Sequence, residues 1–358
     1  MCFFQFGALI FSVSDLEHLG ATPFIDPEDM AKLKNIQRLK LVIPVRQVTL
    51  SSCSSIVDSV RKAIFDFFCQ STDDESLAET LKWLIFEEFE TPRTEWVLAS
   101  CPLCGGREVS LIRASVTKEF TVPCGQCHQL IYLTDVFRLH EAVDNELGAG
   151  GILGYLTTTV EQILAVHLVR LILKTKPPLL RNVLFIKDGP LAFFGQTANM
   201  HKPMRRLVQY LFQKHDFFMA GLEKSGAFVE HADQIANLMK PNSVIILSND
   251  YIYRYVIPNS GDPTSAYGRT TYYGHKLIFK TSSGNMYVIT LPTVDQKIGP
   301  ARGDFRNLDA ILANVGMLRC DMYDNSLIPV ALANKLVSLA NHPSTKILQR
   351  FAVESVGH

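Results

Sequence analysis

This sequence has no excess of positive or negative charge. Its 358 residues carry 35 Lys+Arg and 35 Asp+Glu, so the formal net charge is zero. A balanced chain that is 47% hydrophobic can bury enough apolar surface to fold, which excludes disorder as its main state. A generally basic coat for nucleic acid is excluded too. Any contact with DNA therefore has to come from local patches.

Long apolar runs are also lacking. No run of roughly eighteen apolar residues occurs, so the sequence predicts no membrane span. The richest stretch, 160–173, is interrupted by charged and polar residues. The segment 1–11 is as apolar as a signal-peptide core, but no basic residues precede it and Asp15 follows it. We therefore expect a buried strand at 1–11 and a cytoplasmic protein.

Several nucleotide and hydrolase motifs are absent. The sequence contains no Rossmann glycine pattern and no nucleophile elbow. The glycine-rich run 148–151 lacks the Lys-Ser/Thr that a P-loop requires. The chemistry has to be sought in other residues.

The first half of the chain mixes strands and helices. We expect a strand over 38–50, interrupted by Pro44, a strand over 96–99, and a short hairpin formed by 109–112 and 120–122. Apolar residues at helical spacing predict helices over 56–68, 77–89, 133–147 and 158–174. The glycines at 148–151 indicate a break before the last of these helices.

The second half alternates strands and helices. We expect strands over 183–186, 217–220 and 244–247, with helices over 203–214 and 229–239 between them. This order predicts parallel strands joined by helical crossovers. A hairpin is expected over 272–280 and 286–291, and helices over 308–318, 329–339 and 344–353.

These patterns predict an α/β fold: a mixed sheet with flanking helices and a small cysteine-rich insertion. We divide the chain into an N-terminal part (1–95), the insertion (96–130), a main body (131–300) and a C-terminal helical segment (301–358).

Four of the eight cysteines form two close pairs, Cys101/Cys104 and Cys124/Cys127, with nineteen residues between Cys104 and Cys124. This is zinc-ribbon spacing, since each C-x-x-C turn presents two thiolates and Zn²⁺ prefers four in a tetrahedron. Four cysteines leave no open position, so we predict a structural zinc; a redox motif is the alternative. His128 is expected at the surface.

Asp188 is the first acidic candidate. It ends the apolar run 184–186 and precedes a Gly-Pro turn, and open α/β sheets place ligands at such strand ends. A plain Asp-Gly turn explains the same pattern.

Glu161 is the second. It shares helical spacing with Leu164 and Leu168, which predicts a carboxylate on a buried stripe that needs a cation. A capping box that starts at Thr158 is the alternative explanation. Together, Glu161 and Asp188 could hold Mg²⁺ or Mn²⁺.

Basic residues follow in the sequence. Lys224, in a Lys-Ser-Gly turn after the strand 217–220, could bind phosphate, or could lie in an ordinary solvated loop. Further on, 269–276 interleaves aromatic residues with cations, which suits single-stranded nucleic acid as well as an edge strand.

Two segments carry a family resemblance. The runs 185–195 (FIKDGPLAFFG) and 220–235 (AGLEKSGAFVEHADQI) resemble the NurA nucleases of prokaryotes. The stretches 270–280 and 327–339 fit more loosely, and 3–26 weakly. The resemblance covers most of the chain after residue 150, and a zinc ribbon is not a required feature of the family.

The resemblance implies an RNase H-like fold and a Mn²⁺- or Mg²⁺-dependent DNA nuclease that forms a homodimer. It also implies a partner, a hexameric HerA-type ATPase, which feeds DNA to the nuclease in DNA end processing or antiphage defence. In the family, metal is held by an Asp on the first strand, a helix Glu and a later strand Asp. Glu161 and Asp188 match the second and third. Lys224 then becomes an expected active-site or DNA contact, and His275 a further catalytic candidate.

One part of the family pattern is absent. The first acid belongs to an Asp-Gly-Ser motif, which does not occur in this sequence. Either the chain starts late or a metal ligand has been lost. Asn334 also stands roughly where the resemblance places a histidine. The alternative hypothesis is therefore a catalytically silent DNA-binding or docking subunit of a HerA-type complex.

Overall fold

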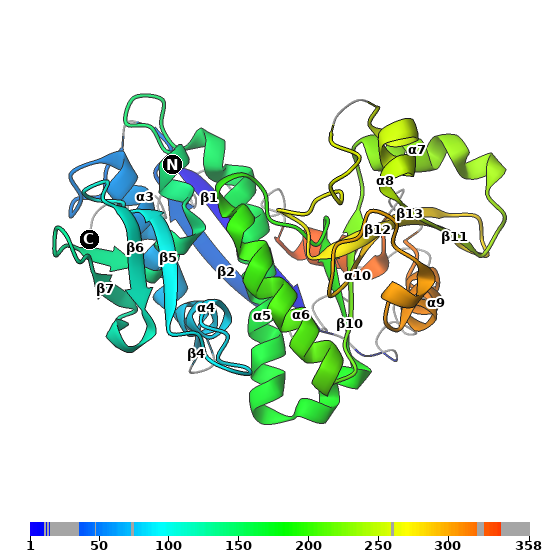
Figure 1. The fold of residues 1–358 in the computed structure, drawn as a ribbon, viewed down its shortest axis with the longest axis horizontal. Helices are drawn as coiled ribbons and strands as arrows, with labels where there is room; N and C mark the ends of the chain where they lie inside the picture. The colour runs from blue at the N-terminus through cyan, green and yellow to red at the C-terminus, as the bar shows by residue number, and fades with distance from the viewer. Residues whose placement is uncertain are drawn as a thin grey trace.

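The computed structural model describes residues 1–10, 12, 14, 36–46, 48–72, 75–258, 261–320 and 326–337. The expected helix over 344–353 and the acidic residue Asp15 lie outside these ranges. Within them the fold is mixed α/β, as expected (Figure 1).

A five-stranded mixed sheet forms the main body, in the order β11-β12-β13-β10-β9. Its strands are β9 (Leu184–Asp188), β10 (Phe218–Glu223), β11 (Ser243–Ile246), β12 (Gly274–Lys280) and β13 (Met286–Pro292). β9 and β10 are parallel and are joined through α6 (His201–Lys214), which confirms the expected crossover. The expected β12–β13 hairpin is confirmed as well.

The expectation of a third parallel strand is wrong. β11 pairs antiparallel with β12 and lies at the opposite edge of the sheet from β9. After α7 (Ala227–Ile235) the chain crosses to that edge of the sheet. There the backbone N–H and C=O groups of β12 pair with those of β11. Alternation along the chain predicts a strand here but does not reveal its partner.

A separate two-stranded ribbon forms from β1 (Cys2–Leu9) and β2 (Ile36–Ile43). β2 ends before Pro44, as expected, because proline has no N–H for the ladder. In β1 only Phe6 is fully buried, so the expectation of a buried strand holds only in part. In Figure 1 this ribbon runs behind α5, and the five-stranded sheet lies to the right of that helix.

The helix α5 (Leu153–Thr175) begins earlier than expected. Leu156, Val160 and Ile163 form its fully buried stripe, whereas Glu161 lies on the half-buried flank. Thr158 is inside the helix, so it cannot cap it. The capping-box explanation of Glu161 is therefore wrong. The helix ends at Thr175, before two prolines that cannot continue it.

By length and composition alone, the helical run Gly150–Thr175 would be able to cross a membrane. Half of its most apolar window is buried inside the fold, as in the core helix of a folded domain.

Helices α3 (Ile56–Cys69) and α4 (Leu77–Ile85) form where helical spacing predicts them, with Ser55 and Ser76 as N-caps. The expected helix over 133–147 is replaced by two 3₁₀ segments, Leu133–Phe137 and Leu139–Ala142. Arg138 between them is left-handed, with φ 59°, and this stops the helix.

Other helices and strands of the described chain are β3 (Ser71–Thr72), β4 (Glu75–Ser76), α8 (Asn249–Tyr251), α9 (Leu308–Met317) and α10 (Ile328–Val337). Helices α5 and α10 both contact β1 and β9. Phe185 of β9 belongs to the core around α5, whereas Leu184 and Ile186 pack with α9 and α10. Since side chains alternate along a strand, Lys187 faces α5 and Asp188 faces α10.

Candidate metal centre and acidic site

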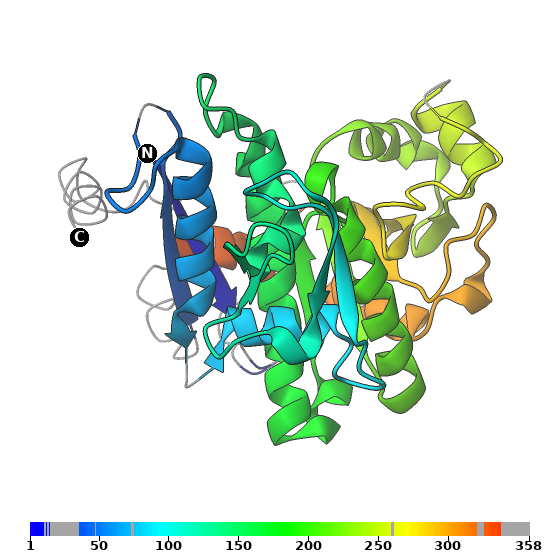
Figure 2. The same ribbon diagram turned by 60° about the vertical axis from the view of Figure 1, so that its left-hand side comes forward.

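Two short hairpins carry the four paired cysteines. β5 (Glu95–Ser100) pairs with β6 (Arg107–Ile112), and β7 (Thr121–Pro123) pairs with β8 (Leu130–Tyr132). The expected hairpin between 109–112 and 120–122 is wrong, because each segment pairs across its own cysteine turn. Figure 2 brings these hairpins forward. Their apolar side chains belong to the same core cluster as those of α3, α4 and α5.

The two cysteine turns have the same backbone geometry. Cys101 N–H donates to Gly106 O at 2.7 Å, and Cys124 N–H donates to Gln129 O at 2.9 Å. In each turn the residue after the second cysteine is left-handed: Gly105 has φ 71° and His128 has φ 57°. His128 is exposed, as expected.

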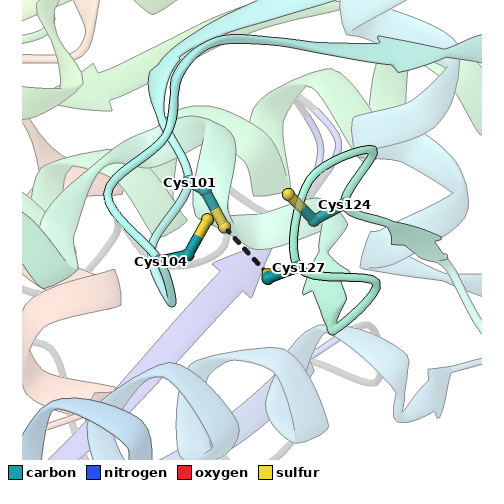
Figure 3. A group of neighbouring side chains, drawn as sticks. All are labelled: Cys101, Cys104, Cys124 and Cys127. Atoms are coloured by element: carbon teal, nitrogen blue, oxygen red, sulfur yellow. Dashed lines mark hydrogen bonds between the residues drawn. The ribbon is translucent and has the colours of Figure 1, made fainter.

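The four sulfur atoms lie within 4.8 Å of one another and point toward a common centre (Figure 3). The Sγ atoms of Cys101 and Cys127 are 4.0 Å apart. Four thiolates around zinc with bonds of about 2.3 Å are separated by roughly 3.8 Å. The cluster is therefore sized for a tetrahedral ion, and it could bind a metal such as zinc with no position left for a substrate.

Backbone groups already prepare part of this cluster for a cation. Hydrogen bonds from the backbone of Cys127, and then of Gln126, lower the pKa of the Cys124 thiol to about 7. Burial raises the pKa of Cys101 to about 11. A metal bound here has to displace protons from its thiols, so its affinity rises with pH.

A second group of charged residues lies at the end of β9. Glu161 of α5 forms an ion pair with Lys187, whose Nζ lies 3.1 Å from Oε2 of Glu161. Burial, and then the charge of Asp188, raise the pKa of Glu161, although Lys187 opposes the shift. The two predicted acids therefore interact electrostatically, although they approach the strand end from opposite faces of the sheet.

Asp188 is held by two side chains from elsewhere in the chain. Lys224 Nζ lies 2.7 Å from Oδ2 of Asp188, and Asn334 Nδ2 donates to the same oxygen at 3.0 Å. Lys224 follows β10, which runs parallel to β9 and ends beside it. The structure thus brings together the predicted residues Glu161, Asp188 and Lys224.

His275 does not belong to this group. β10 and β13 lie between its strand, β12, and β9, so at about 4.8 Å per strand it is separated by roughly 14 Å. Its Nε2 accepts a hydrogen bond from Lys297 N–H at 3.0 Å, and the residue is 5% exposed. Burial lowers the pKa of His275 to about 4. These contacts indicate a neutral structural histidine.

The aromatic and cationic run over 269–276 does not form a surface for nucleic acid. Tyr272, Tyr273, His275 and Lys276 are all buried. Arg205, from the basic start of α6, donates to the backbone of Tyr272 and Arg269 and so ties this loop to the helix. The single-strand platform is therefore wrong, and so is the edge-strand alternative, because β12 lies between β11 and β13 in the sheet.

Three charged or polar residues in or near this group were not singled out as functional from the sequence. Lys187 could have been found from strand alternation, because the residue before Asp188 has to face α5. Glu223 of β10 forms a buried ion pair with Lys276 of β12, next to Lys224 along the chain. Asn334, noted only for its departure from the family pattern, reaches Asp188 through packing that spacing does not reveal.

Among the described residues, the four cysteines form the group of three or more His, Cys, Asp or Glu side chains that lie close enough together to hold a metal ion. Glu161 and Asp188 form a pair without a third acid among these residues. Comparison with family models, curated proteins and solved structures finds no match to this chain.

Proposed function

We propose that this protein is a DNA nuclease of the NurA kind, with an RNase H-like body and a structural zinc ribbon. The observation that carries the proposal is the meeting of Glu161, Asp188 and Lys224 at the end of β9. These residues come from the two segments that resemble the family and from a preceding helix.

The contact between Asn334 and Asp188 supports the alignment with the family. The resemblance placed a histidine at about position 334, and the side chain there touches the candidate catalytic acid at 3.0 Å.

The donor set fits a hard divalent cation. Glu161 and Asp188 offer carboxylate oxygens, and Mg²⁺ is often held by one or two carboxylates with substrate phosphates and water completing the shell. In this structure the ammonium groups of Lys187 and Lys224 are the cations paired with these two carboxylates. A bound Mn²⁺ or Mg²⁺ would supply activation of water and stabilisation of the leaving oxygen.

The chain's own residues have simpler tasks in this proposal. Glu161 and Asp188 hold the cation, and Lys224, on the exposed side of Asp188, contacts the DNA phosphate. The N–H groups at the start of α7 follow Lys224 directly and add to the positive potential there. A homodimer and a HerA-like ATPase partner remain part of the proposal through the resemblance.

Cleavage of linear DNA in the presence of Mn²⁺ tests the proposal, with wild type compared with Asp188→Ala and with Asp233→Ala. Asp233, on α7, is an exposed acid with no place in the site and serves as the control. We expect Asp188→Ala to lose cleavage by about a hundredfold or more, and Asp233→Ala to retain it. Equal cleavage by all three proteins would exclude Asp188 from the chemistry.

A second candidate function is a catalytically silent DNA-binding or docking subunit of a HerA-type complex. It is favoured by the pairing of both acids with lysines and by the absence of a third acid among the described residues. Intact binding of DNA and of the ATPase, with no metal-dependent cleavage by the wild type alone or in the complex, would select this function.

A further inference from the structure

Lys187 places a nearly buried ammonium group against Glu161 and the backbone of Asp188. Its side chain is only 6% exposed, and its Nζ lies 3.1 Å from Glu161 and also donates to the carbonyl oxygen of Asp188. Lysine is rarely buried to this degree unless it is paired. Space beside it is limited, because a Cβ on Gly189 would lie 3.3 Å from Nζ.

Four charged side chains therefore balance one another at this strand end. Glu161 pairs with Lys187 on the face toward α5, and Asp188 pairs with Lys224 at the face toward α10. Their charges sum to zero, so a divalent cation that arrives alone meets two ammonium groups and little net attraction. The binding of metal requires that the lysines leave their carboxylates.

Phosphate is the natural alternative partner for these lysines. An ammonium group binds a phosphate oxygen as a point charge, and a DNA backbone brings several such oxygens at once. The side chain of Lys224 is 28% exposed, so it is accessible from solvent, and Lys187 lies one residue before Asp188 on the same strand. Lys224 can therefore exchange its carboxylate for a phosphate without refolding of β10, whereas Lys187, whose side chain is only 6% exposed, has to move out of its buried position to do so.

We propose that Lys187 and Lys224 are exchangeable counter-ions that couple the binding of divalent metal to the binding of DNA. In the free protein each lysine neutralises its own carboxylate. When DNA is bound, the lysines pair with phosphate and release Glu161 and Asp188 for the cation. This inference rests on the proposed function. By linkage, DNA strengthens metal binding by the same factor as metal strengthens DNA binding.

The test is a titration of the full chain with Mn²⁺, followed by the electron paramagnetic resonance signal of the free ion. It is carried out with and without a short phosphorothioate DNA strand, which resists cleavage. We expect DNA to tighten Mn²⁺ binding to the wild type roughly tenfold. Lys187→Met should bind Mn²⁺ as tightly without DNA as the wild type does with it, and Lys187→Arg should behave as the wild type.

Lys276→Met is the matched control, because Lys276 is also a buried lysine paired with a glutamate on the same sheet. It should leave the Mn²⁺ titration unchanged. A thermal melt of each variant reports whether it is folded. If Lys187→Met does not fold, Lys224→Gln carries the same expectation, since its pair is partly exposed.

The outcomes separate this inference from the function on which it rests. Tight Mn²⁺ binding by the wild type that DNA and Lys187→Met leave unchanged overturns the coupling, while the metal-dependent nuclease stands. Mn²⁺ binding that Asp188→Ala does not weaken, in any of these proteins, overturns both.

Discussion

Asn334 of α10 donates a hydrogen bond to Oδ2 of Asp188 at 3.0 Å, across 146 residues of sequence. The same oxygen also receives Lys224, so Asp188 is oriented by one neutral and one charged partner. Asn334 itself is exposed, and its amide therefore positions the carboxylate without being needed for the core.

Under the proposed nuclease function, Asn334→Ala should lower DNA cleavage more than it lowers stability. Loss of one exposed hydrogen bond changes the free energy of unfolding by about 1 kcal/mol or less. The Asp188 carboxylate then keeps Lys224 as its partner but loses the amide that helps to orient it. We therefore expect cleavage to fall by about tenfold. Single-turnover cleavage and urea unfolding of the same samples provide the comparison. A large loss of stability with normal cleavage would assign Asn334 to the fold instead.

Loss of metal binding by the cysteine cluster should destabilise the part of the fold around α3, α4 and α5. Cys101 and Cys124 belong to the same core cluster as residues of α3, α4 and α5, so the two cysteine hairpins cannot loosen alone. We expect Cys124→Ser to lose the zinc and to lower the melting temperature by roughly 5 °C or more. Elemental analysis and thermal melts measure the two effects.

Cys53→Ser is the control for this change, since Cys53 lies outside the cluster. It should retain one zinc per chain and the melting temperature of the wild type. Zinc retained at full occupancy by Cys124→Ser would contradict a four-cysteine site.

Local signals in the sequence predicted most elements, because their causes are local. Helical spacing predicts α3 and α4, and Pro44 marks the end of β2. The two apolar runs on either side of the turn residues 282–285 (SSGN) predict the β12–β13 hairpin. The cysteine spacing predicts the cluster, because two C-x-x-C turns need only come together to place four thiols. The pairing of β11 with β12 is a long-range choice, and nothing in the spacing of 244–247 reveals it.

The acidic site could be predicted only in part. Strand and helix patterns identify Asp188 and Glu161, but the start of α5 at Leu153 removed the capping alternative that the sequence left open. His275 sits in a pattern of aromatics and cations that is typical of a surface, yet tertiary packing buries it. Which cations satisfy the two acids depends on how the helices lie on β9, and spacing alone does not contain this information.

The buried histidine gives the protein a predictable response to acid. Burial lowers the pKa of His275 to about 4 from the ordinary value of 6.5. In the unfolded chain the ring takes up its proton near pH 6.5, so the unfolded state binds more protons between these values. Stability from this residue is therefore complete above pH 6.5 and is lost as the pH falls toward 4.

His275→Gln should remove this response, since glutamine does not titrate and its carbonyl can accept the hydrogen bond from Lys297 N–H. We expect the difference between wild type and variant in the free energy of unfolding to shrink between pH 7 and pH 5, by on the order of 2 kcal/mol. Urea unfolding at both values measures it. Under the proposed nuclease function, cleavage at pH 7 should be retained, and its loss would return His275 to the candidate acidic site.

The ion pair between Glu223 and Lys276 should be costly to break from one side. Lys276 is 3% exposed, and its ammonium group also lies over the rings of Phe228 and Tyr272 at 4.2 and 4.9 Å from their centroids. Glu223→Ala leaves this charge buried without its carboxylate, and we expect a loss of about 3 kcal/mol.

The double variant Glu223→Ala/Lys276→Met should recover at least half of that loss, because it removes the unpaired charge and retains an apolar side chain against the two rings. Urea unfolding of the wild type, both single variants and the double variant gives the coupling energy directly. Additive effects of the two changes would mean that the pair contributes no coupling to the sheet. In that case the rings of Phe228 and Tyr272 would be the main partners of Lys276.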